Sequence, residues 1–193
     1  MRIIAGKKRG KIINAPKGLT TRPTTDRVKE AIFSTLNPFL AGAVVLDAFA
    51  GSGGLGLEAI SRGAARAVFC ESDRSAQNVI RKNIADCGFE EQSKLLCGDT
   101  LQLLRRTGGF DIVLLDPPYN RGLIARVEQI LLTPDFLNQD SLVMLETSAS
   151  EPELFLSSRW QLYKSKTYGD TAVYYFGLAD YYNDDSENDE AEV

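Results

Sequence analysis

From residue 43 onward, short and continuously apolar runs alternate with segments that have the hydrophobic periodicity of helices. Strands that are apolar on both faces are typical of a parallel sheet covered by helices, so this alternation restricts the fold to the α/β class. Only the turn at 168–171 separates the last two runs, which predicts at least one antiparallel strand. We expect strands over 44–46, 67–70, 94–97, 112–115, 142–146, 161–167 and 172–178, and helices over 54–62, 74–87, 100–106 and 122–132.

The loop after the first of these strands is rich in glycine. Gly51-Ser52-Gly53-Gly54-Leu55-Gly56 matches G-x-G-x-x-G between a strand and a helix, which is the context that this motif requires. Glycine allows a tight turn and a close approach of the backbone to a ligand. Glu71 lies twenty residues after Gly51, at the end of the next strand, where a carboxylate can accept hydrogen bonds from ribose hydroxyls. The pattern predicts a nucleoside-containing cofactor.

Polar residues at three strand ends favour S-adenosylmethionine over a dinucleotide. Asp47 precedes the glycines, where it would repel a pyrophosphate but attract a cationic sulfonium ligand. Asp99 follows the third strand, where its side chain can meet an adenine amino group, and Asp116 ends the fourth. The carboxyl ends of the strands share one rim of the sheet. We expect cofactor contacts from Asp47, Phe49, Ala50, Gly51, Ser52, Gly53, Glu71, Ser72, Asp99, Thr100 and Asp116.

The fourth strand runs into Asp116-Pro117-Pro118-Tyr119, the candidate catalytic motif. The exocyclic amine of a nucleic-acid base is a poor nucleophile, because its lone pair is delocalised into the ring. The Asp116 carboxylate and the Pro117 carbonyl can both accept hydrogen bonds from such an amine and aim its lone pair at a methyl group. The prolines fix φ and remove N–H donors, so the loop presents acceptors rigidly. Tyr119 can stack on the base.

Charge is distributed unevenly along the chain. Residues 180–193 hold seven acids and no base, and without them the chain carries 22 bases and 19 acids. Residues 1–29 hold nine bases and one acid. A basic amino-terminal region suggests a polyanionic partner, whereas the acidic end is expected to be a disordered tail over 180–193.

Composition excludes several other classes of protein. The sequence has no histidine, three cysteines and no C-x-x-C pair, which disfavours a metal site, a disulfide framework and Ser-His-Asp or Cys-His chemistry. No run approaches the roughly 20 apolar residues of a membrane span. The first residues lack the apolar core of a signal peptide. We expect a cytoplasmic monomer that binds neither membrane nor metal.

The first 20 residues predict a basic β-hairpin, with β-prone runs at 2–5 and 11–14 around a glycine-bounded turn. Thr24 or Thr25 can cap a helix that runs to about Leu36, before Pro38. Residues 21–179 then form the catalytic domain. The candidate substrate-binding residues are Arg2, Lys7, Lys8, Arg9, Arg22, Thr25 and Arg27.

These motifs carry a family resemblance. The chain resembles the RsmD family, bacterial methyltransferases that make N2-methylguanosine in small-subunit (16S) ribosomal RNA. The resemblance covers about residues 1–178 and rests on Arg2-Ile3-Ile4-Ala5-Gly6, on Arg22-Pro23-Thr24-Thr25-Asp26-Arg27-Val28-Lys29-Glu30, on Asp47-Ala48-Phe49-Ala50-Gly51-Ser52-Gly53, on Asp116-Pro117-Pro118-Tyr119 and on Tyr168-Gly169.

The resemblance implies a Rossmann-like class I S-adenosylmethionine-dependent methyltransferase with a seven-stranded, mostly parallel sheet and one antiparallel strand. It further implies that the amino-terminal hairpin helps to engage RNA, that residues 22–30 close over cofactor and base, and that the substrate is ribosomal RNA or an assembling small subunit. The alternatives are an adenine-N6 methyltransferase acting on DNA or RNA, an enzyme that methylates a protein glutamine, an NAD-dependent oxidoreductase and a non-catalytic RNA-binding module.

Overall fold

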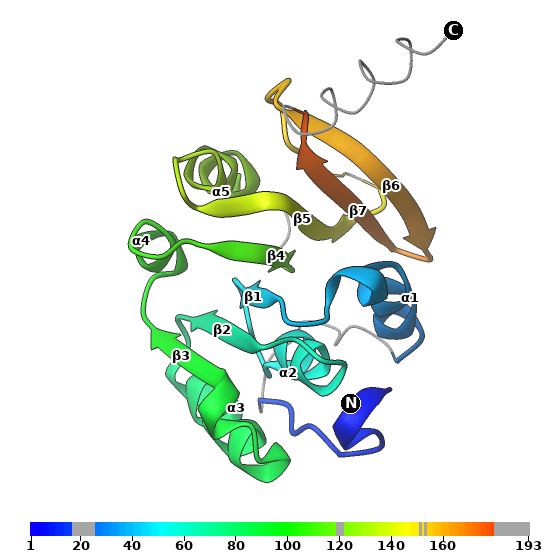
Figure 1. Cartoon of the computed structure of the whole chain (residues 1–193), viewed down its shortest axis with the longest axis vertical. Helices are drawn as coiled ribbons and strands as arrows, with labels where there is room; N and C mark the ends of the chain where they lie inside the picture. The colour runs from blue at the N-terminus through cyan, green and yellow to red at the C-terminus, as the bar shows by residue number, and fades with distance from the viewer. Residues whose placement is uncertain (17–25, 119–121, 151, 153, 180–193) are drawn as a thin grey trace, which may run out of the picture.

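The computed structural model describes residues 1–16, 26–118, 122–150, 152 and 154–179. A central sheet is covered on both faces by helices, as Figure 1 shows. The strands are β1 (Val44–Asp47), β2 (Arg66–Glu71), β3 (Ser93–Cys97), β4 (Phe110–Leu115), β5 (Leu137–Ser148), β6 (Trp160–Tyr168) and β7 (Thr171–Leu178). The α-helices are α1 (Asp26–Leu36), α2 (Gly54–Ser61), α3 (Arg74–Cys87), α4 (Thr100–Leu104) and α5 (Leu123–Leu131).

The seven strands follow the order β3-β2-β1-β4-β5-β7-β6. The strands β1 to β5 are mutually parallel, and β7 pairs antiparallel with both β5 and β6. The sheet is therefore mostly parallel with one antiparallel strand, which confirms the expected fold class. The order reverses beside β1, between β1 and β4, which is where doubly wound sheets bind their ligands.

Two apolar layers flank the sheet. On one face, α1, α2 and α3 pack against alternate strand residues such as Val45, Leu114 and Met144. On the other face, α4 and α5 cover the intervening residues such as Leu46, Val113 and Leu145. Because side chains of a strand alternate between faces, burial on both sides requires the continuous apolar runs of the sequence.

Local signals fix the ends of several elements. Asp73 caps α3 by accepting a hydrogen bond from the Ala76 N–H, and Gly88 ends that helix with a φ of 65°, which favours glycine. The observed bounds match the expected helix over 74–87. The strand β5 begins at Leu137, five residues before the apolar run at 142. Its first residues are largely polar and pair irregularly with β4, and Asp140 among them has a φ of 59°.

The amino-terminal segment forms a short and irregular version of the predicted hairpin. Its two β-prone runs pair through one antiparallel bridge, between Arg2 and Ile12, and through hydrogen bonds from the Ile3 N–H to the Lys11 carbonyl and from the Ile13 N–H to the Met1 carbonyl. A 3-10 turn over Gly6–Lys8 forms its tip. Ile3 and Ile13 are buried in the same core layer as α1 and α2, so the hairpin packs against the rest of the domain. Residues 17–25, with the expected caps Thr24 and Thr25, and residues 180–193 lie outside the described residues.

Gly6 allows this packing. Its φ is 81°, and a Cβ there would lie 1.8 Å from the carbonyl oxygen of Ser61. Hydrogen bonds hold this turn against the end of α2: the Lys8 N–H donates to Ser61 Oγ, and Ser61 Oγ donates to the Ala5 carbonyl. The basic turn therefore sits at the carboxyl end of α2, at the opposite end of that helix from the glycine loop.

Within the described part of the chain, no helix is long and apolar enough to cross a membrane. All three cysteines are free; Cys70 and Cys87 are buried, whereas Cys97 is exposed.

Candidate active site

A cavity of about 1300 Å³ opens at the carboxyl ends of the central strands. It gathers side chains from the glycine loop, the ends of β2, β4 and β5, the start of α1 and the turn between β6 and β7. Of the predicted cofactor contacts, Asp47, Phe49, Ala50, Gly51, Ser52, Glu71, Ser72, Asp99, Thr100 and Asp116 all line it. Gly53 does not; it has a φ of 75° and begins α2 behind the loop, against Phe69.

Four carboxylates line this cavity from four adjacent strands: Glu71, Asp47, Asp116 and Glu146, in the order β2, β1, β4 and β5. The residues two positions before them (Phe69, Val45, Leu114 and Met144) all lie in one core layer, beneath α1 and α2. Because side chains alternate along a strand, the four acids project toward the same side of the sheet. Glu146 was not among the predicted site residues, although it ends an apolar run just as Asp116 does.

Burial makes two of these acids, Asp47 and Asp116, reluctant to ionise. Burial raises the pKa of Asp47 to about 7, against the lowering effect of the Gly56 N–H, with smaller contributions from the charges of Asp116 and Glu71. Burial also raises the pKa of Asp116 to about 6. A positively charged ligand relieves the repulsion among such carboxylates. The donor set therefore fits a sulfonium cofactor and would disfavour a pyrophosphate.

Two of these acids also shape the glycine loop. Asp47 Oδ2 accepts a hydrogen bond from the Gly56 N–H at 2.9 Å, in the first turn of α2. Glu71 Oε2 accepts from the Gly51 N–H at 2.8 Å, and its Oε1 accepts from the Asp73 N–H at 2.7 Å. A carboxylate oxygen can accept a second bond, so Glu71 can hold the loop and still receive ribose hydroxyls.

Replacing Glu71 by alanine is expected to weaken S-adenosylmethionine binding by about 1.5–3 kcal/mol, the range for hydrogen bonds to charged groups. The loss has two sources, the ribose contacts and the looser glycine loop. Isothermal titration calorimetry measures it, with Glu91→Ala, an exposed acid outside the cavity, as the control. An unchanged dissociation constant for the Glu71 variant would exclude the ribose role.

Asp99 has a structural task as well. Its Oδ1 accepts a hydrogen bond from the Gln102 N–H at 2.9 Å and so caps α4. The side chain is exposed at the edge of the cavity, whereas the following Thr100 is buried. Capping fixes the side chain at the place where the sequence predicts an adenine contact.

The catalytic motif faces the same space. Asp116, Pro117 and Pro118 line the cavity, with Pro117 buried, and Tyr119 lies outside the described residues. Arg27 and Val28 of α1 and the turn at 168–171 also line the cavity. Arg27 was a predicted substrate-binding residue, whereas Val28 and the turn were not among the predicted site residues. The charge of Arg27 acts on Tyr168 of that turn, where burial is the larger influence and raises the pKa of the phenol.

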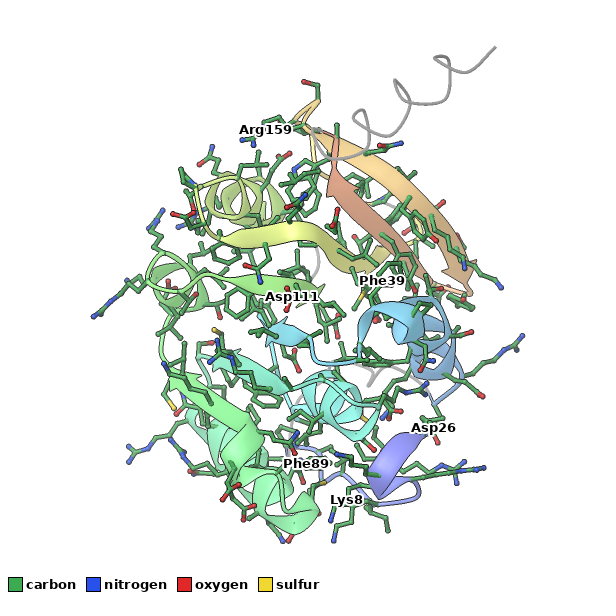
Figure 2. All side chains as sticks on the ribbon, in the orientation of Figure 1. Lys8, Asp26, Phe39, Phe89, Asp111 and Arg159 are labelled. Carbon is green, nitrogen blue, oxygen red and sulfur yellow. The ribbon has the colours of Figure 1, made fainter. Side chains whose placement is uncertain are left out.

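The predicted substrate-binding residues separate into two groups. Arg27 lines the cavity. Arg2 forms an exposed ion pair with Asp26 at 2.9 Å, and Lys7, Lys8 and Arg9 lie on the basic turn, away from the cavity. Lys8 Nζ lies 5.9 Å from the ring centre of Phe89, and Figure 2 shows the two side by side. Arg22 and Thr25 are outside the described residues.

Known structures resemble this fold over nearly its whole length. The "Putative methyltransferase yhhF from Escherichia coli" has 35% sequence identity and a TM-score of 0.82, over 92% of this chain and 97% of that one. The "putative methylase HI0767 from Haemophilus influenzae" has 32% identity and a TM-score of 0.77, over 91% and 97% of the two chains. At 18% identity, an RNA methyltransferase from Salinibacter ruber solved with S-adenosyl-L-homocysteine shares the fold with a TM-score of 0.60, over 80% and 92%. Strand order, glycine loop and acidic cavity thus define a class I methyltransferase whose cofactor is S-adenosylmethionine.

The family follows from the sequence comparisons. This chain belongs to the family described as "Conserved hypothetical protein 95", whose model matches residues 1–177, and this is the RsmD family that the motifs resemble. It is 37% identical over 173 residues to "Ribosomal RNA small subunit methyltransferase D" of Haemophilus influenzae, covering 88% of this chain and 89% of that protein. The protein of the same name from Escherichia coli K12 is 35% identical over 89% and 87% of the two chains.

Proposed function

We propose that this methyltransferase modifies the exocyclic N2 amine of a guanine in small-subunit ribosomal RNA. The observation that carries the proposal is the position of Asp116 and Pro117 beside Asp47 and Glu71 in one cavity. An acceptor pair for an amine thereby adjoins the residues suited to a cationic methyl donor. The names of the relatives in Haemophilus influenzae and Escherichia coli supply the substrate class.

The chain's own contribution to the reaction is orientation and electrostatics. The cofactor, when bound, supplies an electrophilic methyl group. The Asp116 carboxylate and the Pro117 carbonyl would accept hydrogen bonds from the two N–H groups of the amine and turn its lone pair toward the cofactor. The new N–C bond would replace the sulfonium S–C bond, with S-adenosylhomocysteine as the leaving group, and the methylated nitrogen would lose one proton to Asp116 or to water. Pro117 and Pro118 hold φ fixed, so the acceptors do not have to reorganise as the reaction proceeds. Tyr119 is proposed to stack on the base that enters the cavity.

Glu146 supports guanine over adenine. On its Watson–Crick edge guanine carries an N1–H donor next to the N2 amine, whereas adenine presents a bare N1 acceptor beside its N6 amine. Glu146 follows the last paired residues of β4 and β5, next to Asp116, and its side chain is buried at the cavity wall. A carboxylate in this position accepts from guanine N1–H and repels adenine N1. The adenine-N6 alternative therefore fits this wall less well.

A product analysis tests this assignment. Small subunits from cells that lack the enzyme are incubated with methyl-labelled S-adenosylmethionine, and the RNA is digested to nucleosides. Label is expected in N2-methylguanosine. Label in N6-methyladenosine would transfer the proposal to the adenine class, and label in the protein fraction would support the glutamine alternative.

The acidic row also predicts a pH dependence of cofactor selection. S-adenosylmethionine carries a positive sulfonium that S-adenosylhomocysteine lacks, so it gains more from ionised Asp47 and Asp116. With a pKa of about 7 for Asp47 and about 6 for Asp116, both become more ionised between pH 6 and pH 8. The preference for S-adenosylmethionine should rise over this interval, by at most about tenfold per pH unit and proton.

Calorimetric titrations of both ligands across pH measure this preference. Asp47→Asn retains an acceptor for the Gly56 N–H and should flatten the upper part of the profile. A constant ratio of the two dissociation constants from pH 6 to pH 8 would contradict the proposed role of these carboxylates.

A further inference from the structure

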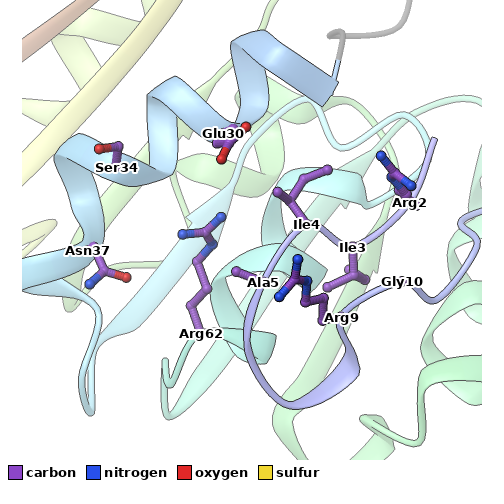
Figure 3. A pocket seen from close by; sticks show the side chains of 10 residues that line it. All are labelled: Arg2, Ile3, Ile4, Ala5, Arg9, Gly10, Glu30, Ser34, Asn37 and Arg62. Atoms are coloured by element: carbon purple, nitrogen blue, oxygen red, sulfur yellow. The ribbon is translucent and has the colours of Figure 1, made fainter.

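A second hollow, of about 660 Å³, lies between the amino-terminal segment and α1. Figure 3 shows it lined by Arg2 and Arg9 on one side, by Glu30 and Ser34 of α1 and the following Asn37 on the other, and by Arg62 between them. Three arginines and one glutamate line this hollow; of the arginines, Arg2 pairs with Asp26 and Arg62 with Glu58. Nothing in the proposed methyl transfer uses it, and we call it the α1 groove.

Arg62 is the unusual residue of the α1 groove. Its side chain is only 10% exposed, and its Nε donates to Glu58 Oε1 at 2.7 Å. The guanidinium carbon lies 5.2 Å from the ring centre of Phe33. Nη2 is buried without a hydrogen-bond partner among the described residues. A buried guanidinium N–H without an acceptor is costly, so its presence at a hollow indicates a missing anion.

The buried charges beneath the α1 groove also favour an anionic ligand. Lys29 and Glu58 are fully buried, and Lys29 Nζ lies 3.2 Å from Glu58 Oε2. Glu58 also accepts hydrogen bonds from the Ile4 and Ala5 N–H groups and from Arg62. The Glu58 carboxylate is thus the shared partner of two cations, Lys29 and Arg62. When both are protonated, these three side chains together carry one excess positive charge. Burial lowers the pKa of Lys29, against the raising effects of Glu58 and Asp26.

We propose that the α1 groove binds a backbone phosphate of the RNA substrate, with Arg62 as its central ligand and Arg2 and Arg9 at its rim. A phosphate oxygen supplies the acceptor that Nη2 lacks, and an arginine fork suits phosphate geometry. Ser34 and Asn37 add neutral donors, and Glu30 limits the excess of positive charge.

The position of the groove favours RNA over a small free anion. Met1 and Arg27 line the catalytic cavity, while their neighbours Arg2 and Glu30 line the groove. Arg27 and Glu30 are three residues apart on α1, a rise of about 4.5 Å. A strand that places one base in the cavity can therefore set a nearby phosphate in the groove. This step rests on the proposed function, since it requires an RNA substrate.

Binding of a fluorescein-labelled, single-stranded RNA of mixed sequence tests the groove across a salt series. Arg9→Ala and Arg62→Lys should each weaken binding about tenfold, the size of one charge-assisted contact. Arg9→Ala should also lower the salt slope by about 0.7, whereas Arg62→Lys keeps the charge and should leave the slope unchanged. Arg62→Lys keeps a cation beside Glu58, and Arg9 is exposed, so the pair separates binding from misfolding. Arg106→Ala, an exposed base outside the groove, is the matched control and should bind as the wild type does.

Three further readouts make the outcome decisive. Cofactor affinity should stay unchanged in both groove variants, and KM for small subunits should rise while kcat holds. In thermal unfolding, RNA should protect the wild type more than inorganic phosphate at equal phosphate concentration. Wild-type affinity in both groove variants, or equal protection by inorganic phosphate, would overturn the proposal. Absence of methyl transfer to RNA by the wild type would instead refute the proposed function.

Discussion

Replacing Asp116 by alanine is expected to reduce the rate of methyl transfer about 10²–10³-fold, the loss typical of one preorganised polar contact to a reacting group. The variant removes one of the two acceptors that orient the amine. Binding of S-adenosylmethionine should fall far less than the rate, because only the charge of Asp116 is lost while Asp47 and Glu71 keep their contacts to the glycine loop. Single-turnover transfer from labelled cofactor to small subunits measures the effect.

Asp116→Asn refines this prediction. Asparagine keeps an acceptor oxygen in the same place but cannot ionise, so its rate should lie between those of the wild type and of the alanine variant. Its rate should also lose the fall that the wild type shows as the pH drops through the pKa of Asp116, about 6. Wild-type turnover by the alanine variant would show that Asp116 takes no part in methyl transfer.

Replacing Glu58 by alanine should lower the free energy of unfolding by about 3–5 kcal/mol, the cost of breaking a buried ion pair by removing one partner. Lys29 and Arg62 would lose their shared carboxylate inside the protein, and the Ile4 and Ala5 N–H groups would lose their acceptor. The amino-terminal segment should therefore detach as well. Urea unfolding, followed by circular dichroism, measures the change.

The exposed pair Lys82–Asp86 provides the matched control. Its two side chains are 63% and 34% exposed, so Asp86→Ala should cost far less stability than Glu58→Ala. Equal costs for the Glu58 and Asp86 variants would show that the buried cluster contributes nothing particular to stability.

Regular elements were predictable because their signals are local. Asp73 and Gly88 mark both ends of α3, and the apolar runs of β1 to β4 lie within the observed strands. Burial on both faces of the sheet explains those runs. The polar start of β5 was missed, because irregular pairing around Asp140 follows from its neighbours and leaves no apolar periodicity.

The cofactor side of the cavity was predictable for a similar reason. Its residues follow strand ends, and in a parallel sheet those ends necessarily meet. The substrate side was predicted only in part. Arg27 was assigned to it, but the turn at 168–171 reaches the cavity through tertiary packing that no spacing in the sequence records. The role of Glu58 and Arg62 was also not predictable, because their spacing is that of an ordinary i,i+4 pair on a helix. Only the packing of Ile3 and Lys29 buries them and creates the α1 groove.

We propose that this cavity transfers a methyl group to a base amine in ribosomal RNA. The most direct measurement is a single turnover of enzyme preloaded with methyl-labelled cofactor on unmodified small subunits, followed by mass spectrometry of the RNA. We predict one labelled guanine per particle, carrying the methyl group on N2, and no label with Asp116→Ala on the same time scale. Label on ribosomal protein, label scattered over many nucleotides, or equal labelling by the Asp116 variant would contradict the claim.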